Sequence, residues 1–235
     1  MIPPRCSLVI PFFQEAGNVA PVVSAAGAAL RVLDPGFEAI LVDDGSTDAT
    51  GRELAAAAAA LPRARVVTLP ENLGQAAALA IGLREAKGDL IFTMDGDGQN
   101  DPADFPALLD LLERDQLDLV CGRRCERRDP ALRRAMSWLA NAIRRRVLHD
   151  RVHDAGCQLR VFRRGVVGAL LPSPLMQSFL PAMAVAAGYR VGELPVRHHP
   201  RRKGASKYRL GNLWWRPFAE MIRLRRLLRP RKLSR

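Results

Sequence analysis

The chain has 235 residues, of which 48% are hydrophobic, so it can bury a substantial core and is not disordered throughout. Its formal net charge of +12 is unevenly spread, because the first 120 residues are net acidic and the rest is strongly basic. A basic half favours phosphates, nucleic acid or acidic lipid as partners, and an acidic half suits a divalent cation. No segment is typical of a signal peptide or a spanning helix, since prolines interrupt the longest uncharged stretch, 165–189. We therefore expect a cytoplasmic protein that meets any membrane from its surface.

Short apolar runs alternate with helical patterns along the acidic part of the chain. Runs rich in Val, Ile and Leu predict buried strands at 6–11, 38–42, 65–69, 90–94 and 117–121. Stretches rich in Ala and Leu predict helices between them, at 17–33, 48–61, 74–87 and 104–115. This alternation predicts an α/β fold with a mostly parallel central sheet flanked by helices.

The pattern changes after residue 122. Helices are expected at 130–148, 175–187 and 217–229, strands at 158–163 and 189–196, and a mobile basic loop at 197–210. In the last helix, Met221, Leu224, Leu227 and Leu228 share one side and arginines the other. Such a basic amphipathic helix suits an anionic lipid surface, and packing on the domain is the alternative. We expect a domain at 1–210 and a membrane-surface tail at 211–235.

Polar clusters follow the predicted strands, at the sheet edge where open parallel sheets bind ligands. The first runs from Pro11 to Glu15. In the second, Asp43 and Asp44 end a buried strand and can accept hydrogen bonds from a ribose or a base. A third, 72–75, contains a glycine that permits a tight turn at a helix N-terminus, which can face an anion.

The segment Asp95-Gly96-Asp97-Gly98-Gln99 carries the strongest signal. Two carboxylates two residues apart, with the amide oxygen of Gln99, offer three oxygen ligands, which Mg²⁺ and Mn²⁺ prefer. An EF-hand calcium loop and a purely structural turn are the alternatives. Pro106 argues against the EF-hand, because it stands at the twelfth position, where a calcium loop needs Glu.

Basic residues form a further group, which includes Arg123, Arg124, Arg133, Arg201 and Lys207. Guanidinium forks bind phosphate oxygens in a bidentate way, although a solvated basic face remains open for each residue. The four histidines form no obvious base–orienter pair, and Asp154 is a candidate for orienting a substrate group.

Together these clusters resemble family 2 glycosyltransferases of the GT-A fold, in particular dolichol-phosphate mannosyltransferases and bacterial polyprenyl-phosphate sugar transferases. The resemblance runs from about Cys6 to Tyr208 and includes the basic block 201–208. It implies three sets of residues. The metal and diphosphate ligands would be Asp95, Asp97 and Gln99. The nucleotide pocket would hold Pro11, Phe13, Glu15, Asp43, Asp44, Asn72, Gly74 and Gln75. The acceptor phosphate and a closing loop would use Arg123, Arg124, Arg133, Ser137, Arg201, Ser206 and Lys207.

The resemblance also implies a reaction, the inverting transfer of a sugar from a GDP- or UDP-sugar to a polyprenyl phosphate, with Mg²⁺ or Mn²⁺. The chain departs from the family at Gln177-Ser178, at Cys157, and at Gly96, where Ala is commoner. These departures bear on the acceptor site rather than on the reaction class. A protein or soluble glycan acceptor, a nucleic-acid-binding protein and a non-catalytic scaffold are the alternatives, although no nucleic-acid motif is present and no nucleic-acid partner is expected.

Overall fold

The computed structural model describes residues 4–124, 131–200 and 215–228, with the backbone alone for 131–138 and 215–217. Seven strands form one sheet: β1 (Cys6–Phe12), β2 (Glu38–Asp43), β3 (Ala64–Thr68), β4 (Leu90–Thr93), β5 (Leu119–Arg124), β6 (Arg160–Arg163) and β7 (Val191–Val196). The α-helices are α1 (Val19–Leu33), α2 (Thr50–Ala60), α3 (Gln75–Glu85), α4 (Phe105–Arg114), α5 (Ala131–Leu148), α6 (Met176–Ala186) and α7 (Trp215–Leu227). Two 3₁₀ helices are η1 (Pro102–Asp104) and η2 (Arg164–Ala169).

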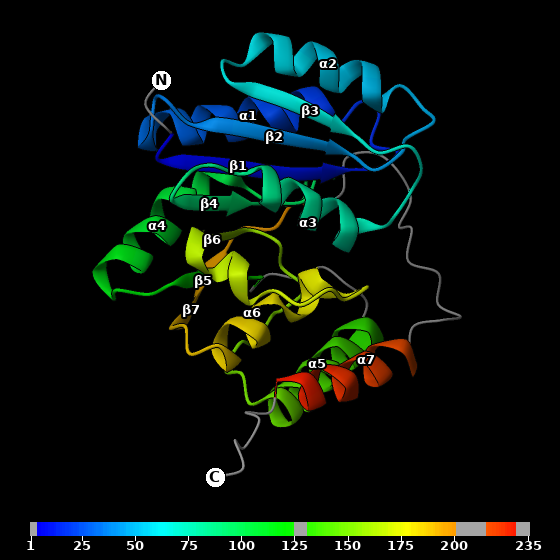
Figure 1. Ribbon diagram of the computed structural model, residues 1–235, viewed down its shortest axis with the longest axis vertical. Coiled ribbons are helices and arrows are strands. Elements are labelled where there is room, and N and C mark those ends of the chain that lie inside the picture. Colours follow the sequence, from blue (N-terminus) through cyan, green and yellow to red (C-terminus); the bar gives the residue numbers. More distant parts are fainter. Residues whose placement is uncertain (1–3, 125–130, 201–214, 229–235) are drawn as a thin grey trace.

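The sheet has the strand order β3-β2-β1-β4-β6-β5-β7 (Figure 1). The pairs β1–β2, β2–β3, β1–β4 and β5–β7 are parallel, and β6 alone runs antiparallel to both of its neighbours. The predicted mostly parallel sheet is confirmed. Because β6 reverses direction between β4 and β5, those two strands point the same way, and their carboxyl ends reach the same edge.

Helices cover both faces of the sheet and divide the core into two layers. Along β1, Leu8, Ile10 and Phe12 point into the layer under α1, α2 and α4, whereas Val9 points into the layer under α3 and α6. This period-two alternation places apolar side chains on both faces, as expected for a parallel sheet between helices. The sheet is thereby fixed as a rigid support for the loops at its edge.

The helices α5 and α7 lie side by side at the lower end of the molecule (Figure 1). Met221 and Leu224 of α7 are 5% and 0% exposed and belong to the core layer under α3 and α6. The four apolar residues predicted on one face of this helix therefore have different surroundings. Met221 and Leu224 pack on the domain, whereas Leu227 is 55% exposed. The predicted boundary at residue 210 lies outside the described residues. Within the described part of the chain, no helix is both long and apolar enough to cross a membrane.

Candidate active site

Four parallel strands end at one edge of the sheet and bring the polar clusters together. The register pairs Phe12 with Asp43 across β1 and β2, and β4 ends beside them at Thr93. The strand β5 extends to Arg124, so both of its terminal arginines belong to the strand rather than to the loop after it. Acidic loops and a basic strand end thus share the edge where open α/β sheets bind ligands.

The Asp43-Asp44 cluster and the 72–74 cluster form one unit. Asp44 is buried, and its carboxylate accepts hydrogen bonds from Asn72 Nδ2 (2.9 Å), Leu73 N (2.8 Å) and Gly74 N (3.0 Å). Burial raises the pKa of Asp44, although the two backbone N–H groups lower it in part. Gly74 has φ of 90°, which confirms the tight turn predicted before α3. The carboxylate of Asp44 therefore shapes the loop around the expected nucleotide pocket.

The loop after β1 is tied to the loop after β2. Gln14 adopts a left-handed φ of 51°, and its backbone N–H donates to Ser46 Oγ (3.0 Å). The next N–H, that of Glu15, donates to Thr50 Oγ1 (2.8 Å). Phe13 is partly exposed at the edge, as is Pro11 at the end of β1. Ser46 and Thr50 thus fix the backbone of the expected pocket.

The acidic loop after β4 is held in a defined shape by amide side chains and backbone. Gln75 Nε2 donates to Asp95 Oδ1 (2.6 Å), while Asp95 N donates to Asn100 Oδ1 (3.0 Å). Asp97 is 9% exposed, and its Oδ1 accepts from Gln99 N (3.1 Å). The sequence interpretation placed Gln75 in the nucleotide pocket, and in the structure its amide contacts the first acidic residue of the loop.

A glycine separates the two aspartates because the backbone passes over a buried aromatic ring. A Cβ at Gly96 would lie 2.4 Å from Phe12 Cδ1, and Phe12 is 1% exposed. Contacts this short require the ring or the loop to move, because the ring is enclosed by the core. The departure at Gly96 noted in the sequence therefore has a local steric cause.

We expect Gly96→Ala to lower the free energy of unfolding by about 1–3 kcal/mol, as overpacking of a filled core does. Urea unfolding of the purified variant measures the loss. Phe12→Leu in the Gly96→Ala background should recover part of it, because the smaller side chain vacates the ring position. A Gly96→Ala variant as stable as the parent chain would show that the Phe12 contact does not constrain this position.

Two histidines at the end of β7 reach the acidic loop, which the sequence analysis missed. An isolated bridge joins His198 to Asn100, and Gln99 Nε2 lies 3.4 Å from His198 Nε2. His199 Nε2 lies 3.2 Å from Asp101 Oδ2, and the amide nitrogen of Gln99 donates to the His199 carbonyl (3.3 Å). The amide of Gln99 is therefore engaged with the chain after β7, and its role as a third metal ligand stays a prediction.

The sequence showed no obvious base–orienter pair among the four histidines, but the structure places two of them beside carboxylates. Besides His199 with Asp101, His153 Nδ1 lies 2.7 Å from Glu193 Oε2. The start of the expected mobile loop is also held, since Arg197 forms ion pairs with Asp101 (3.3 Å) and Asp104 (2.8 Å). The predicted strand at 189–196 could have indicated that the histidines after it reach the acidic loop. As β7 it runs parallel to β5, so its carboxyl end lies at the sheet edge where β5 also ends.

Arg124 is held by Asp154 in a bidentate pair. Its Nε donates to Asp154 Oδ2 (2.7 Å) and its Nη2 to Oδ1 (2.8 Å), while the Arg124 backbone N–H adds a third bond (3.2 Å). Both side chains are largely buried, with 14% and 8% exposed. Burial lowers the pKa of Arg124, but Asp154 more than offsets it, and Asp95 adds to the rise, so the pKa lies above its ordinary value. Asp154, predicted to orient a substrate group, orients an arginine.

Several predicted site residues are not placed by the structure. The backbone of α5 includes Arg133 and Ser137, whose side chains are outside the described part. The three loop residues, Arg201, Ser206 and Lys207, lie outside the described residues altogether. Arg123 precedes Arg124 in β5 and is partly exposed at the same edge. The structure places Arg123 and Arg124 at the end of β5. Contacts of any of these residues with an acceptor phosphate stay predictions.

The acidic loop can be tested for its fit to a divalent cation. Within the described ranges, no three His, Cys, Asp or Glu side chains converge as a closed metal site. Asp95 and Asp97 supply carboxylate oxygens from one loop, which suits a hard cation that keeps positions for substrate phosphates and water. The residues therefore fit Mg²⁺ or Mn²⁺ bound together with a diphosphate, and they do not fit a caged structural ion.

Comparison with known proteins identifies the family. A family model described as glycosyl transferase family 2 matches residues 7–171. The dodecaprenyl-phosphate galacturonate synthase of Rhizobium johnstonii is 42% identical over 213 residues, which cover 86% of this chain and 61% of that protein. The undecaprenyl-phosphate 4-deoxy-4-formamido-L-arabinose transferase of Yersinia enterocolitica is 36% identical over 89% of this chain and 64% of its own length. The chain thus spans less than two thirds of these relatives.

Solved structures support the same fold. Glucosyl-3-phosphoglycerate synthase from Mycobacterium tuberculosis, in complex with Mg²⁺ and uridine diphosphate, aligns with a TM-score of 0.64 at 22% identity. The alignment covers 85% of this chain and 73% of that chain. The GT-A fold expected from the sequence is confirmed. With a family model that covers most of the chain, and with these relatives, the chain belongs to glycosyl transferase family 2.

Proposed function

We propose that this chain is an inverting glycosyltransferase that moves a sugar from a nucleotide-sugar to a polyprenyl phosphate, with Mg²⁺ or Mn²⁺ as cofactor. One observation carries the proposal. The acidic loop after β4 and the arginine end of β5 lie at one sheet edge, close enough for Asp95 to raise the pKa of Arg124. A transferase that joins two phosphate-bearing substrates needs both an acidic cation site and a basic anion site there. The names of the relatives, which act with dodecaprenyl and undecaprenyl phosphate, support a lipid acceptor.

The residues of the edge divide into donor and acceptor roles. Asp95 and Asp97 would hold the cation, which when bound neutralises the negative charge on the leaving nucleoside diphosphate. Glu15 and Asp43 would contact the nucleoside, beside the loop that Asp44 organises. Arg124, fixed by Asp154, would orient the acceptor phosphate so that one oxygen faces the anomeric carbon from the side opposite the diphosphate, which inverts that carbon.

The acceptor needs little activation by the protein. A phosphate monoester is already largely dianionic near neutral pH, since its second pKa is about 6. Its oxygen is a nucleophile without a general base. Residues at the acceptor side therefore have to position the phosphate and reduce its repulsion from the donor diphosphate, which is what a bidentate arginine can do.

A membrane acceptor requires a membrane-facing surface, and we infer that the exposed side of α7 supplies it. Phe218, Ile222 and Leu227 are 41%, 48% and 55% exposed, and Arg225 and Arg226 are exposed beside them. Basic helices with exposed apolar side chains bind anionic interfaces. Met221 and Leu224 are buried in the protein and do not take part. The chain would then act as a peripheral protein at the inner face of the membrane.

The donor site is tested by ligand-induced stabilisation. We expect a UDP- or GDP-sugar with Mn²⁺ or Mg²⁺ to stabilise the folded chain by about 2–3 kcal/mol at a concentration about 100 times its dissociation constant. UDP-galacturonic acid, UDP-glucose and GDP-mannose form the panel, and a thermal melt gives the shift. EDTA should remove most of the shift. Uridine with the metal is the matched control, because it lacks the diphosphate.

The acceptor is tested by product analysis. The donor that stabilises the chain is incubated with a short, soluble polyprenyl phosphate, and mass spectrometry looks for the glycosyl phosphate. Transfer to the polyprenyl phosphate is expected. Transfer to a soluble glycan or a protein instead would contradict the lipid acceptor, and donor binding with neither transfer nor hydrolysis would favour a scaffold.

A further inference from the structure

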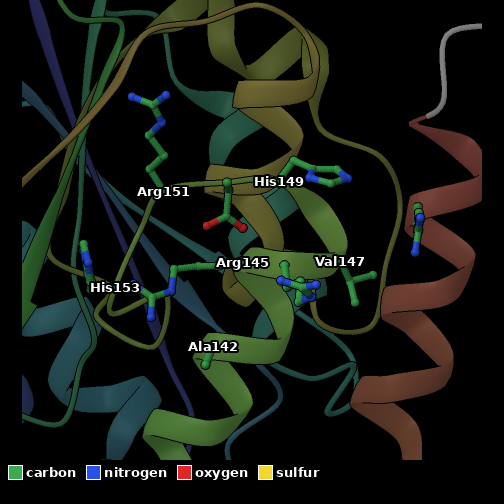
Figure 2. Close-up of a pocket in the computed structure, with 9 residues that line it drawn as sticks. Ala142, Arg145, Val147, His149, Arg151 and His153 are labelled. Atoms are coloured by element: carbon green, nitrogen blue, oxygen red, sulfur yellow. The ribbon is translucent and has the colours of Figure 1, made fainter.

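A groove of about 1050 Å³ opens between the C-terminal half of α5, the segment 149–153 and α7. Figure 2 shows Arg145, His149, Arg151 and His153 around this opening, with α7 alongside. Two further arginines, Arg146 and Arg225, complete a basic lining. It lies along α5 and α7, away from the nucleotide edge formed by β1, β2 and β4.

Among residues 4–124, 131–200 and 215–228, few acidic groups neutralise the charges of this lining. Among the described lining residues Asp150 is the one acid, and Arg144 engages it, since Arg144 Nη1 lies 2.6 Å from each carboxylate oxygen. Of the ion pairs between described residues, none includes a groove arginine, namely Arg145, Arg146, Arg151 or Arg225. Arginines elsewhere on the surface do pair, such as Arg197 with Asp104 (2.8 Å) and Arg223 with Glu220 (2.9 Å). A concave surface with several uncompensated cations attracts anions.

A smaller apolar pocket adjoins the groove. It has a volume of about 250 Å³, and it shares His149 and Arg151 with the groove. Val185, Tyr189 and Val191 line its other side together with one acid, Glu193, whose carboxylate lies 2.7 Å from His153 Nδ1. A basic groove next to an apolar pocket fits an amphiphile, whose phosphate meets the arginines while part of its hydrocarbon meets the valines. A soluble phosphate would use only the first of these surfaces.

The groove is also close to the residues that hold Arg124. Glu193 Oε1 accepts hydrogen bonds from the backbone N–H groups of His153 (2.8 Å) and Asp154 (3.0 Å). One of these residues lines the groove, and the next forms the bidentate pair with Arg124. A molecule in the groove would therefore sit against the segment that positions the expected acceptor site.

We propose that this groove binds the phosphate headgroup of an anionic membrane lipid, at a position separate from the acceptor phosphate. The inference rests on the proposed function in one respect, namely that the acceptor is held in a membrane. Bound lipid would fix the chain on the bilayer with α5 and α7 against the headgroups. It would also orient the carboxyl end of β5 toward an acceptor in the same leaflet.

The test measures vesicle binding without donor or polyprenyl phosphate. The chain of residues 1–235 is floated with vesicles of phosphatidylcholine alone or mixed with phosphatidylglycerol, at fixed ionic strength. We expect strong preference for the anionic vesicles. The variant Arg145→Gln/Arg151→Gln, which leaves the surface of α7 intact, should bind them on the order of 25-fold more weakly, since each arginine at an anionic surface contributes about fivefold. The matched control, Arg31→Gln/Arg84→Gln, removes two exposed arginines of α1 and α3 and should stay near the parent chain.

Four outcomes would overturn the proposal. They are equal binding to neutral and anionic vesicles, unchanged binding of the groove variant, an equal loss in both double variants, and groove-dependent binding of inorganic phosphate or duplex DNA that exceeds vesicle binding. Transfer to a short, soluble polyprenyl phosphate is measured on the same variants. Absence of transfer in every protein, including the parent chain, counts against the proposed function, whereas the vesicle result is read independently.

Discussion

We expect Asp97→Asn to lower the turnover of sugar transfer by about a thousandfold or more, because the variant loses a carboxylate that would hold the cation, and the cation neutralises the leaving diphosphate. The substitution keeps the size of the side chain. Its amide oxygen can still accept the hydrogen bond that Gln99 N donates to Asp97 Oδ1 at 3.1 Å. The loop should therefore keep its shape, and the loss should appear in the chemistry and in metal-dependent donor binding.

Steady-state rates with the preferred donor measure this effect, and a thermal melt verifies that the variant is folded. Asp110→Asn is the matched control, because it makes the same chemical change on the exposed surface of α4, outside the acidic loop. Control turnover should equal that of the parent chain. A folded Asp97→Asn protein with nearly full turnover would remove the metal assignment from this loop.

The sequence predicted the elements well because each has a local cause. Buried strands of the parallel sheet are short apolar runs, and the observed β1 (Cys6–Phe12) and β2 (Glu38–Asp43) differ from the predicted ranges by one residue each. The direction of β6 could not be predicted in this way. An apolar run has the same pattern in a parallel strand and in an antiparallel strand. The direction of β6 is decided only by its pairing with β4 and β5.

Within the site, the sequence predicted which loops carry the polar residues, but not which partner each side chain contacts. Asp43 and Asp44 are adjacent and chemically identical, yet Asp44 is committed to the turn before α3 because the chain returns there 28 residues later. His198 was not identified, since nothing near it in sequence connects it with the acidic loop. Arg124 was predicted as a phosphate ligand, and its partner Asp154 lies 30 residues away. Partners so distant in sequence are set by topology, which no local pattern contains.

The Arg124–Asp154 pair is expected to be the most sensitive interaction at the acceptor side. Asp154→Asn removes the carboxylate but leaves Arg124 largely buried, and breaking a buried pair in this way costs about 3–5 kcal/mol of stability. The variant also loses the carboxylate that raises the pKa of Arg124, but a guanidinium stays protonated in proteins at neutral pH, so the side chain cannot escape the cost by losing its proton. The released guanidinium should also take other rotamers, which raises the KM for the acceptor more than that for the donor.

A double-mutant cycle separates pairing from positioning. Arg124→Gln, Asp154→Asn and the double variant are compared by urea unfolding, and the coupling free energy is expected to be about 1–3 kcal/mol. The exposed pair Arg114–Asp110 provides the same cycle without burial and should show no measurable coupling. If Asp154 positions Arg124 for the acceptor, Asp154→Asn raises the acceptor KM only while Arg124 is present, and has no further effect in the Arg124→Gln background. Equal effects of Asp154→Asn in both backgrounds would mean that Asp154 acts on the substrate by itself.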